Sequence, residues 1–235
     1  MSTDNQNNEN GKSSGTMSVW AKTVEEAADH NPAHIARYLI AKKYVTGKRV
    51  CDVACGTGYG CRFLSDSVSN IVGMDISAKA IEWANEYFLR ENIRFIAADL
   101  TEAWPVTEIF GAITSFETME HVVDPEKFLS NIYDHLEPDG VLVLSVPNGP
   151  RDKMKTDNPN HLHHFTKQQL EELFGKVFPK FEFFTQTYKK DFRHYMAKWM
   201  RKLKLLKKQP MFVDNYYLAP GLNDKLKTWV VIARK

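Results

Sequence analysis

A short glycine-rich segment constrains the fold of this chain more than any other feature. Residues 50–60 read V-C-D-V-A-C-G-T-G-Y-G, in which an apolar run is followed by three glycines at alternate positions. Glycine is favoured where the backbone takes a positive φ or where a ligand approaches the main chain closely. The pattern predicts a buried strand, a tight turn, and a helix whose first N–H groups are free. A mononucleotide-like cofactor is therefore expected above this turn.

Two acidic residues at later strand ends indicate which class of cofactor the turn holds. The dinucleotide fingerprint G-x-G-x-x-G fits poorly, because Cys61 stands where its third glycine or alanine belongs. Asp75 ends an apolar strand, at a position where a carboxylate can accept hydrogen bonds from both ribose hydroxyls. Asp99 follows the next strand and suits an adenine amino group, a contact that the nicotinamide fingerprint does not require.

Strands alternate with helices along most of the chain, which predicts a doubly wound α/β fold with a mostly parallel sheet. Each polar motif follows a predicted strand, and ligands of such sheets bind at the carboxyl ends of strands. The expected strands are 48–54, 70–75, 93–97, 109–115, 141–146, 181–187 and 229–233, and the expected helices are 32–44, 58–67, 79–89, 124–137 and 167–176.

Four motifs together resemble the class I S-adenosylmethionine-dependent methyltransferases: D-V-A-C-G-T-G-Y-G, G-M-D-I-S, A-A-D-L and F-E-T-M-E-H-V. They occur in the family's order and spacing, within roughly residues 34–187. The resemblance implies a seven-stranded sheet with an antiparallel last strand, S-adenosylmethionine as cofactor and S-adenosylhomocysteine as product. Carried over by position, the resemblance places Ala54, Gly56 and Gly58 around the methionine part of the cofactor and Asp75 at its ribose. It places Asp99 and Leu100 at the adenine, and Phe116 near the reacting centre. The cofactor residues so implied are Ala54, Gly56, Gly58, Asp75, Ile76, Asp99, Leu100 and Phe116.

The fourth motif supplies the first candidate catalytic residues. Methyl transfer is an in-line displacement in which the protein aligns donor and acceptor, and a hydroxyl acceptor also benefits from a nearby base. Glu117, Glu120 and His121 would share one face if this turn is helical. His121 could accept the proton with Glu120 holding it, or the set could simply shape the cofactor pocket. The E-x-x-E-H pattern also resembles quinone-biosynthesis O-methyltransferases, some of which use a divalent metal, although no metal is favoured here.

A loop after the fifth predicted strand supplies the second candidates. Residues 160–166 read N-H-L-H-H-F-T, with three histidines in four positions. His161 or His163 could act as a base or contact the acceptor, because this loop lies over the acceptor pocket in the family that the chain resembles. The alternative is a loop with surface histidines before a helix. Zinc is not expected, because no pair of cysteines accompanies the histidines.

Further segments resemble type-11 methyltransferases of bacterial glycan and surface-polysaccharide pathways. H-I-A-R-Y at 34–38 occurs there with the G-T-G-Y-G loop, with F-E-T-M-E-H-V and with H-x-x-x-F-T at 161–166. That branch usually has H-V-R-E-F-T where this chain has H-L-H-H-F-T, so acceptor preference can differ. The resemblance implies a sugar or glycan-precursor hydroxyl as acceptor, such as a nucleotide sugar or lipid-linked saccharide. Alternatives are a quinone or lipid O-methyltransferase at the membrane surface, a partner subunit that binds the cofactor without catalysis, and a nicotinamide oxidoreductase.

Positive charge is concentrated in one segment. The chain has a net charge of +2, but residues 189–208 contain nine Lys or Arg and one Asp. Apolar residues in this segment recur every three or four positions from Phe192 to Leu206, which predicts an amphipathic helix. Three interpretations remain open: a helix on an anionic membrane surface, a lid for a diphosphate, and a helix packed on the domain. The segment lacks the interleaved aromatic and basic residues of an RNA-binding module, and no nucleic-acid partner is expected.

The remaining features predict one domain in a reducing, cytoplasmic setting. The three cysteines are expected to be free thiols. No apolar run approaches 18 residues, and the N-terminus lacks the apolar region of a signal peptide. Residues 1–17 are predicted to be disordered and 18–235 to form one methyltransferase domain, with a helical insertion at 188–227. Peripheral contact with the inner membrane surface would occur through the basic helix.

Overall fold

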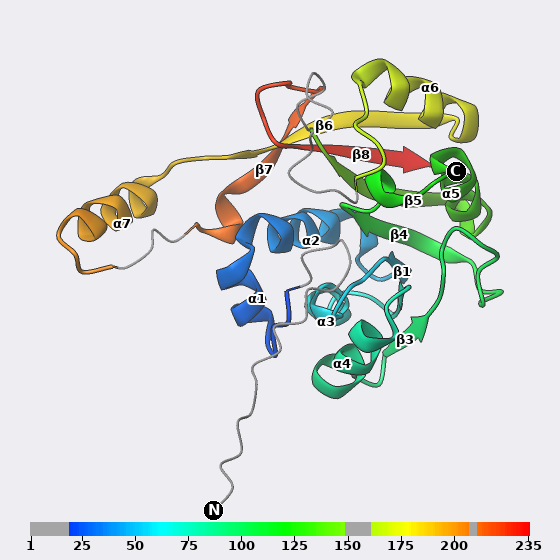
Figure 1. The fold of residues 1–235 in the computed structure, drawn as a ribbon, viewed down its shortest axis with the longest axis horizontal. Helices are drawn as coiled ribbons and strands as arrows, with labels where there is room; N and C mark the ends of the chain where they lie inside the picture. Colours follow the sequence, from blue (N-terminus) through cyan, green and yellow to red (C-terminus); the bar gives the residue numbers. More distant parts are fainter. Residues whose placement is uncertain (1–18, 149–160, 207–210) are drawn as a thin grey trace, which may run out of the picture.

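The fold is a single twisted sheet with helices on both faces (Figure 1). The structure is a computed structural model that describes residues 19–148, 161–206 and 211–235. In those residues the sheet has the strand order β3-β2-β1-β4-β5-β8-β6-β7. The strands are β1 (Arg49–Val53), β2 (Asn70–Asp75), β3 (Ile93–Ala97), β4 (Phe110–Phe116), β5 (Leu136–Pro147), β6 (Lys180–Tyr188), β7 (Tyr216–Pro220) and β8 (Thr228–Arg234).

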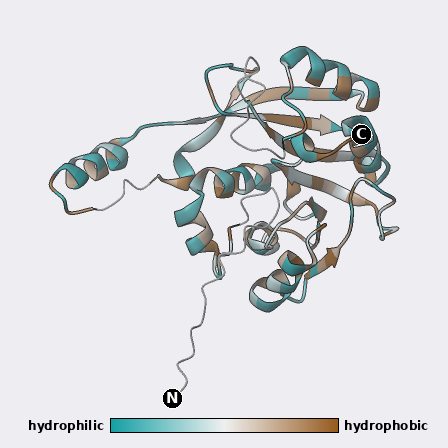
Figure 2. Ribbon diagram, viewed as in Figure 1, coloured by the Kyte–Doolittle hydropathy of each residue, from teal (hydrophilic) through white to brown (hydrophobic). Residues whose placement is uncertain are grey.

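Two apolar cores hold the helices against the sheet. Phe128 and Phe174 pack in the core on one face, and Tyr38, Leu64 and Phe88 pack in the core on the other. Figure 2 shows the hydrophobic residues concentrated along the central strands, as expected for strands buried on both faces. The helices are α1 (Val24–His30), α2 (Pro32–Val45), α3 (Tyr59–Ser65), α4 (Ala78–Phe88), α5 (Pro125–Asp134), α6 (Lys167–Val177) and α7 (Phe192–Lys202), with short 3-10 turns η1 (Met119–His121) and η2 (Val213–Asn215).

The order in which successive strands are added to the sheet reverses between β1 and β4. Strands β1, β2 and β3 follow one another outward on one side, and β4 and β5 follow on the other, all in parallel pairs. Right-handed crossovers therefore place the helices after β1 and β2 on one face and α5 on the other. Ligands of such sheets bind at the carboxyl ends of the strands beside this point. The α/β prediction is confirmed, and every predicted motif lies at this edge.

The predicted sheet of seven strands is corrected to eight. The extra strand, β7, pairs antiparallel with β6 at the edge of the sheet, between Tyr216 and Pro220. It is short and only partly buried, so it lacks the apolar run that reveals a central strand. The last strand, β8, is antiparallel to β5, as the family resemblance implied.

Two predicted helix ends also differ from the structure. Helix α5 ends at Asp134, and β5 begins at Leu136, so the turn expected at 138–140 lies inside that strand. Helix α7 ends at Lys202, earlier than the periodicity predicted, and Lys204 two residues later has a φ of 59°. No helix of the described ranges has both the length and the apolar character needed to cross a bilayer. The tail predicted to be disordered, 1–17, lies outside the described residues.

Replacement of Gly60 by alanine is expected to destabilise the domain. A Cβ at this position, in the first turn of α3, would collide with the Tyr38 ring. Tyr38 is itself fixed by a hydrogen bond from its hydroxyl to Asp52, at 3.0 Å. Overpacking of this kind costs about 1–3 kcal/mol. The matched control is Gly175→Ala in α6, where the nearest neighbour of the new Cβ is 4.0 Å away. Helix propensity should then stabilise by up to about 1 kcal/mol.

Urea unfolding midpoints of the two variants measure this difference. A Gly60→Ala protein as stable as the parent would contradict the close approach of α2 and α3.

Candidate functional site

The turn after β1 is packed tightly against the domain at Gly58 and is open at Gly56. Ala54, Gly56 and Gly58 have φ values of 60°, 56° and 86°. A Cβ added at Gly58 would lie 2.7 Å from the Ala84 Cβ and 2.8 Å from the Phe95 ring, so the turn is packed tightly from below. A Cβ added at Gly56 would have no described neighbour within 4 Å. The backbone is therefore accessible to a ligand at Gly56.

Asp75 links the end of β2 to this turn. One carboxylate oxygen accepts a hydrogen bond from the Gly56 N–H at 2.8 Å, and the other accepts one from the Ser77 N–H at 2.9 Å. Each oxygen of an ionised carboxylate has a further lone pair for a ligand hydroxyl. Ile76, the next residue, is 70% exposed although it is apolar. An exposed isoleucine beside a fixed carboxylate suits a ligand with a planar apolar part next to a diol.

The remaining predicted cofactor residues occupy the ends of β3 and β4. The exposed Asp99 accepts hydrogen bonds from the N–H and the hydroxyl of Thr101, at 3.0 and 2.7 Å. These bonds lower the pKa of the Asp99 carboxyl. Leu100 is buried in the core. Phe116 is also buried, and its ring meets the Tyr38 ring edge-on at 4.8 Å between centroids. The predicted residues thus line the ends of four adjacent strands.

Asp52 is a buried acid that the sequence motif contains but to which no role was assigned. It is 1% exposed and accepts hydrogen bonds from the hydroxyls of Thr114 at 2.6 Å and Tyr38 at 3.0 Å. Burial raises the pKa of Asp52 from 3.8 to about 6, and the hydrogen bonds only partly oppose this. The folded protein therefore binds this proton more tightly than the unfolded chain does.

This raised pKa predicts a pH dependence of stability. Between pH 3.8 and about 6 the unfolded chain releases the Asp52 proton while the folded protein keeps it, so the free energy of unfolding falls as pH rises. A shift of about two pKa units corresponds to about 3 kcal/mol. Urea unfolding at pH 4 and pH 7 should therefore show a fall that is larger in the parent than in Asp52→Asn, because only the parent keeps the Asp52 proton. Parallel pH profiles of the two proteins would contradict the raised pKa.

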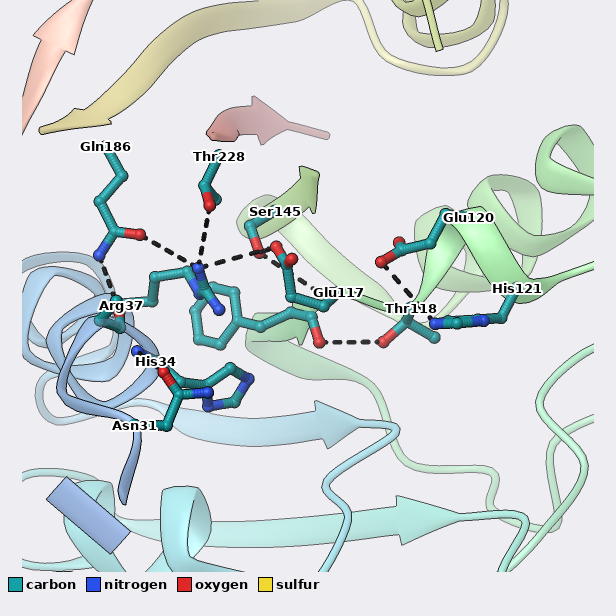
Figure 3. A network of polar contacts seen from close by, with 12 residues as sticks. Asn31, His34, Arg37, Glu117, Thr118, Glu120, His121, Ser145, Gln186 and Thr228 are labelled. Atoms are coloured by element: carbon teal, nitrogen blue, oxygen red, sulfur yellow. Dashed lines mark hydrogen bonds and ion pairs between the residues drawn. The ribbon is translucent and has the colours of Figure 1, made fainter. Parts of the chain in front are cut away.

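The structure brings the two predicted catalytic segments together. His121, in η1 after β4, and His161, after β5, meet with ring centroids 4.7 Å apart at 78°. Glu120 lies beside them, with its Oε1 3.8 Å from the His121 Nε2. Figure 3 shows the Glu120 and His121 side chains turned toward each other at the end of the network. Glu120, His121 and His161 therefore form one cluster, although 40 residues separate the two histidines.

Backbone hydrogen bonds hold the histidine loop against η1. The N–H groups of Leu162 and His163 both donate to the Glu120 carbonyl oxygen, at 2.8 and 3.1 Å. A ring nitrogen of His163 contacts the Val122 carbonyl oxygen at 2.9 Å, and its ring stacks on Phe165. His163 thus fixes the loop, and the interpretation of His163 as a base is not favoured by this geometry.

Glu120 is an unusual buried acid. It is 1% exposed, and neither carboxylate oxygen has a hydrogen-bond partner among the described residues. Burial, followed by the charge of Glu117, raises the pKa of the Glu120 carboxyl well above its ordinary value. Burial, followed by the neighbouring His121, lowers the pKa of His161 below its ordinary value. The cluster therefore favours a protonated acid beside an imidazole that is neutral near pH 7.

Glu117 does not share a face with Glu120 and His121, so the helical arrangement considered for these three residues is wrong. The turn after β4 is not an α-helix, because Glu117 has a φ of 56° and η1 covers only Met119–His121. The Glu117 carboxylate instead accepts a hydrogen bond from the Ser145 hydroxyl at 2.8 Å and lies 3.7 Å from the Arg37 guanidinium.

Arg37 lies at the centre of a polar network that the sequence did not reveal (Figure 3). This buried guanidinium donates to the Gln186 amide oxygen at 3.0 Å and to the Thr228 hydroxyl at 3.4 Å. The network joins α2, β5, β6, β8 and the turn after β4, beside the histidine cluster. Arg37 is part of the H-I-A-R-Y segment that resembles the glycan-pathway methyltransferases, but that resemblance implied no role for Arg37.

The cluster of Glu120, His121 and His161 has the ligand atoms of a divalent-cation site. One ligand atom from each of Glu120, His121 and His161 lies within 4.8 Å of the others. Two imidazole nitrogens and a carboxylate oxygen suit a borderline metal ion. The sequence alone does not favour a metal, and the geometry allows both a metal and a proton relay.

The sequence of this chain is similar to those of known methyltransferases. A family model described as a methyltransferase domain matches residues 20–177, which is more than half of the chain. The ubiquinone biosynthesis O-methyltransferase of Chelativorans sp. is 31% identical over 122 residues, covering 51% of this chain and 48% of that protein. The enzyme of the same name from Neisseria meningitidis is 30% identical over 142 residues, covering 55% and 57%. The chain spans about half the length of the curated relatives it matches.

The fold also matches solved structures. The N-methyltransferase NodS from Bradyrhizobium japonicum, in complex with S-adenosyl-L-homocysteine, superposes with a TM-score of 0.56. The match covers 88% of this chain and 86% of that one at 11% identity. At such identity the likeness shows the fold alone.

Proposed function

This chain belongs to the methyltransferase-domain family and is a class I S-adenosylmethionine-dependent methyltransferase, and we propose that it methylates a hydroxyl oxygen of a small molecule. The single observation that carries the proposal is the convergence of Glu120, His121 and His161 at the end of β4. A hydroxyl is a poor nucleophile until its proton is removed, and paired imidazoles beside the cofactor edge can remove it. A merely structural histidine loop would not require this contact.

The residues at the strand ends fit the cofactor. We assign the open backbone at Gly56 to the methionine part, because a side chain there would fill the space above the turn. Asp75, already oriented by the Gly56 and Ser77 N–H groups, has lone pairs left for the two ribose hydroxyls. Ile76 and Leu100 would contact the adenine, with Asp99 at its amino group.

The chain's own residues would orient the acceptor and accept its proton. Bound S-adenosylmethionine supplies a methyl group on a positively charged sulfur. His161, whose lowered pKa leaves its imidazole neutral near pH 7, would take the proton of the acceptor hydroxyl. His121 contacts the His161 ring and could share the proton with it, and Glu120 lies 3.8 Å from His121. The acceptor oxygen would thus lose its proton as it gains the methyl group, and S-adenosylhomocysteine would be the other product.

A sugar or glycan-precursor hydroxyl is our first candidate acceptor. Its support is that the segments shared with the glycan branch meet in one place: Arg37 from H-I-A-R-Y, Glu117 from F-E-T-M-E-H-V, and His161 from the histidine loop. Proton relay by the histidines is sufficient for such an acceptor. We therefore expect EDTA to leave turnover unchanged.

A phenolic hydroxyl of a quinone precursor is the second candidate. It is favoured by the names of the relatives from Chelativorans and Neisseria and by the cation-binding geometry of Glu120, His121 and His161. Purified enzyme should be assayed with methyl-labelled S-adenosylmethionine against nucleotide sugars and against catechols, with EDTA or with an added borderline divalent cation such as zinc. Sugar methylation that resists EDTA supports the first candidate. Catechol methylation that requires the metal supports the second, and transfer to neither hydroxyl class overturns the proposal.

A further inference from the structure

Helix α7 exposes its large apolar side chains on the face turned away from the domain. Phe192, Tyr195, Met196 and Trp199 follow one another at the spacing of a single helical stripe, and they are 76%, 56%, 38% and 55% exposed. Leu203, one turn further on, is 50% exposed. Ala197 is the one buried residue of α7 and lies on the opposite side of the helix from this apolar stripe.

This orientation is the reverse of the usual one. A surface helix of a globular protein turns its apolar stripe toward the core, and a contiguous exposed apolar patch marks an interaction site. In Figure 1, α7 projects from one end of the molecule, beyond the edge strand β7. The interpretation of α7 as a helix that packs its apolar side on the domain is therefore wrong.

The N-terminal end of α7 is firmly attached to the domain. Asp191 caps the helix by accepting a hydrogen bond from the His194 N–H at 3.1 Å. Arg193 forms ion pairs with Asp191 and Asp214, both at 2.9 Å, and its guanidinium lies 4.6 Å from the centre of the Phe212 ring. The apolar stripe is thus presented by a helix of defined direction, and Arg193 is occupied by this anchoring.

Positive charge lies beside the apolar stripe. Lys198, Arg201, Lys202 and Lys204 are all exposed, and Lys198 and Lys202 border the stripe on one side of the helix. Between 189 and 208 the basic residues exceed the acidic ones by eight, as nine Lys or Arg stand against one Asp. A second copy of the chain would bring two such cationic segments together, which like-charge repulsion opposes. The charge is complementary to an anionic surface.

We propose that α7 binds the surface of a bilayer containing anionic lipid. Phe192, Tyr195 and Trp199 enter the interfacial layer, and the lysines contact the lipid phosphates. Aromatic and aliphatic side chains on one face with Lys and Arg beside them are the composition of interfacial helices. The surface is independent of the proposed acceptor, because it is formed by α7 alone.

The topology places this surface on the same edge of the sheet as the candidate site. Strand β6 is antiparallel to β8, which is antiparallel to β5, so β6 runs parallel to β5. Helix α7 follows the carboxyl end of β6, and the histidine cluster follows the carboxyl ends of β4 and β5. A bilayer bound to α7 would therefore lie on the acceptor side of the domain.

Sedimentation with vesicles tests this proposal on the full chain. Vesicles of phosphatidylcholine alone should leave the protein in the supernatant, and vesicles with one-third phosphatidylglycerol should carry it into the pellet. Raised salt should release it. Neutralising Lys198, Arg201 and Lys202 to glutamine should weaken binding on the order of 100-fold, because each charge contributes about 1 kcal/mol at an anionic surface.

A second variant tests the apolar contribution. Phe192→Ser with Trp199→Ser should weaken binding at least about 100-fold, since burial of one such side chain contributes about 1.5–3 kcal/mol. The matched control is Ile109→Ser, which removes an apolar side chain that is 43% exposed outside α7. This control should bind vesicles like the parent. Binding of S-adenosylmethionine in all three variants shows that the domain remains folded.

Three results would overturn the proposal. The first is equal binding to both kinds of vesicle, and the second is no binding to either. The third is a dimer of the parent, seen by light scattering, that the serine variant converts to a monomer, because the stripe would then be an interface between copies. None of these readouts depends on turnover, so a failure here is distinguishable from a failure of the proposed function.

Discussion

Replacement of Asp75 by alanine is expected to lower the affinity for S-adenosylmethionine by about 100-fold or more while the fold remains intact. The carboxylate is fixed by the Gly56 and Ser77 N–H groups, so it is oriented before a ligand binds. Hydrogen bonds to a charged group are worth about 1.5–3 kcal/mol each, and two ribose hydroxyls would lose them together. Calorimetric titration with S-adenosylmethionine and S-adenosylhomocysteine measures the loss.

Two controls separate this effect from general charge removal. Asp66→Ala removes a carboxylate that is 77% exposed and forms a surface ion pair with Arg62, so affinity should stay unchanged. Asp99→Ala should have a smaller effect than Asp75→Ala, because the Asp99 carboxylate is exposed and bonded to Thr101. Unchanged affinity in Asp75→Ala would refute the assignment of the ribose to this residue.

Replacement of His121 or His161 by alanine is expected to reduce kcat by about 10²–10⁴-fold, the usual contribution of a positioned base. Affinity for S-adenosylmethionine should change little, because neither side chain belongs to the turn after β1. The two rings are in contact, so the double variant should lose much less than the product of the two single losses. Steady-state kinetics with calorimetry on the same preparations measures both quantities.

Two other histidines serve as controls for this prediction. His30 is an exposed residue of α1 whose ring bonds to the Glu26 carbonyl oxygen, so His30→Ala should keep full turnover. His163→Ala removes the contact with the Val122 carbonyl oxygen and should disturb the loop without removing a base. Normal turnover in both His121→Ala and His161→Ala would eliminate the proposed proton relay.

The sequence predicted the elements that place the cofactor residues because those elements follow from local pattern. An apolar run that ends in an acid marks a parallel strand and its carboxyl end at once, which is how Asp75 and Asp99 were found. The glycines after β1 identify a turn whose conformation few other residues adopt. These patterns depend only on residues that are close in the sequence, so they can be recognised before the contacts between distant segments are known.

The candidate catalytic residues could be predicted one by one but not as a cluster, because the cluster depends on contacts between distant segments. His121 and His161 were each singled out, but only the hydrogen bonds from Leu162 and His163 to Glu120 show that they belong together. The Arg37 network depends on Gln186, which is 149 residues away in the chain. Strand β7 was missed because a short edge strand has no buried apolar run.

The most direct test of the account is to incubate the enzyme with methyl-labelled S-adenosylmethionine and an extract of its own host, and then to count label in separated fractions. The account predicts label on water-soluble sugars or glycans as a methyl ether, reduced at least a hundredfold in His161→Ala. Label on a quinone precursor in the lipid fraction would keep the hydroxyl chemistry and move the acceptor to the second candidate. Absence of label from every fraction, with S-adenosylmethionine binding intact, would contradict the account.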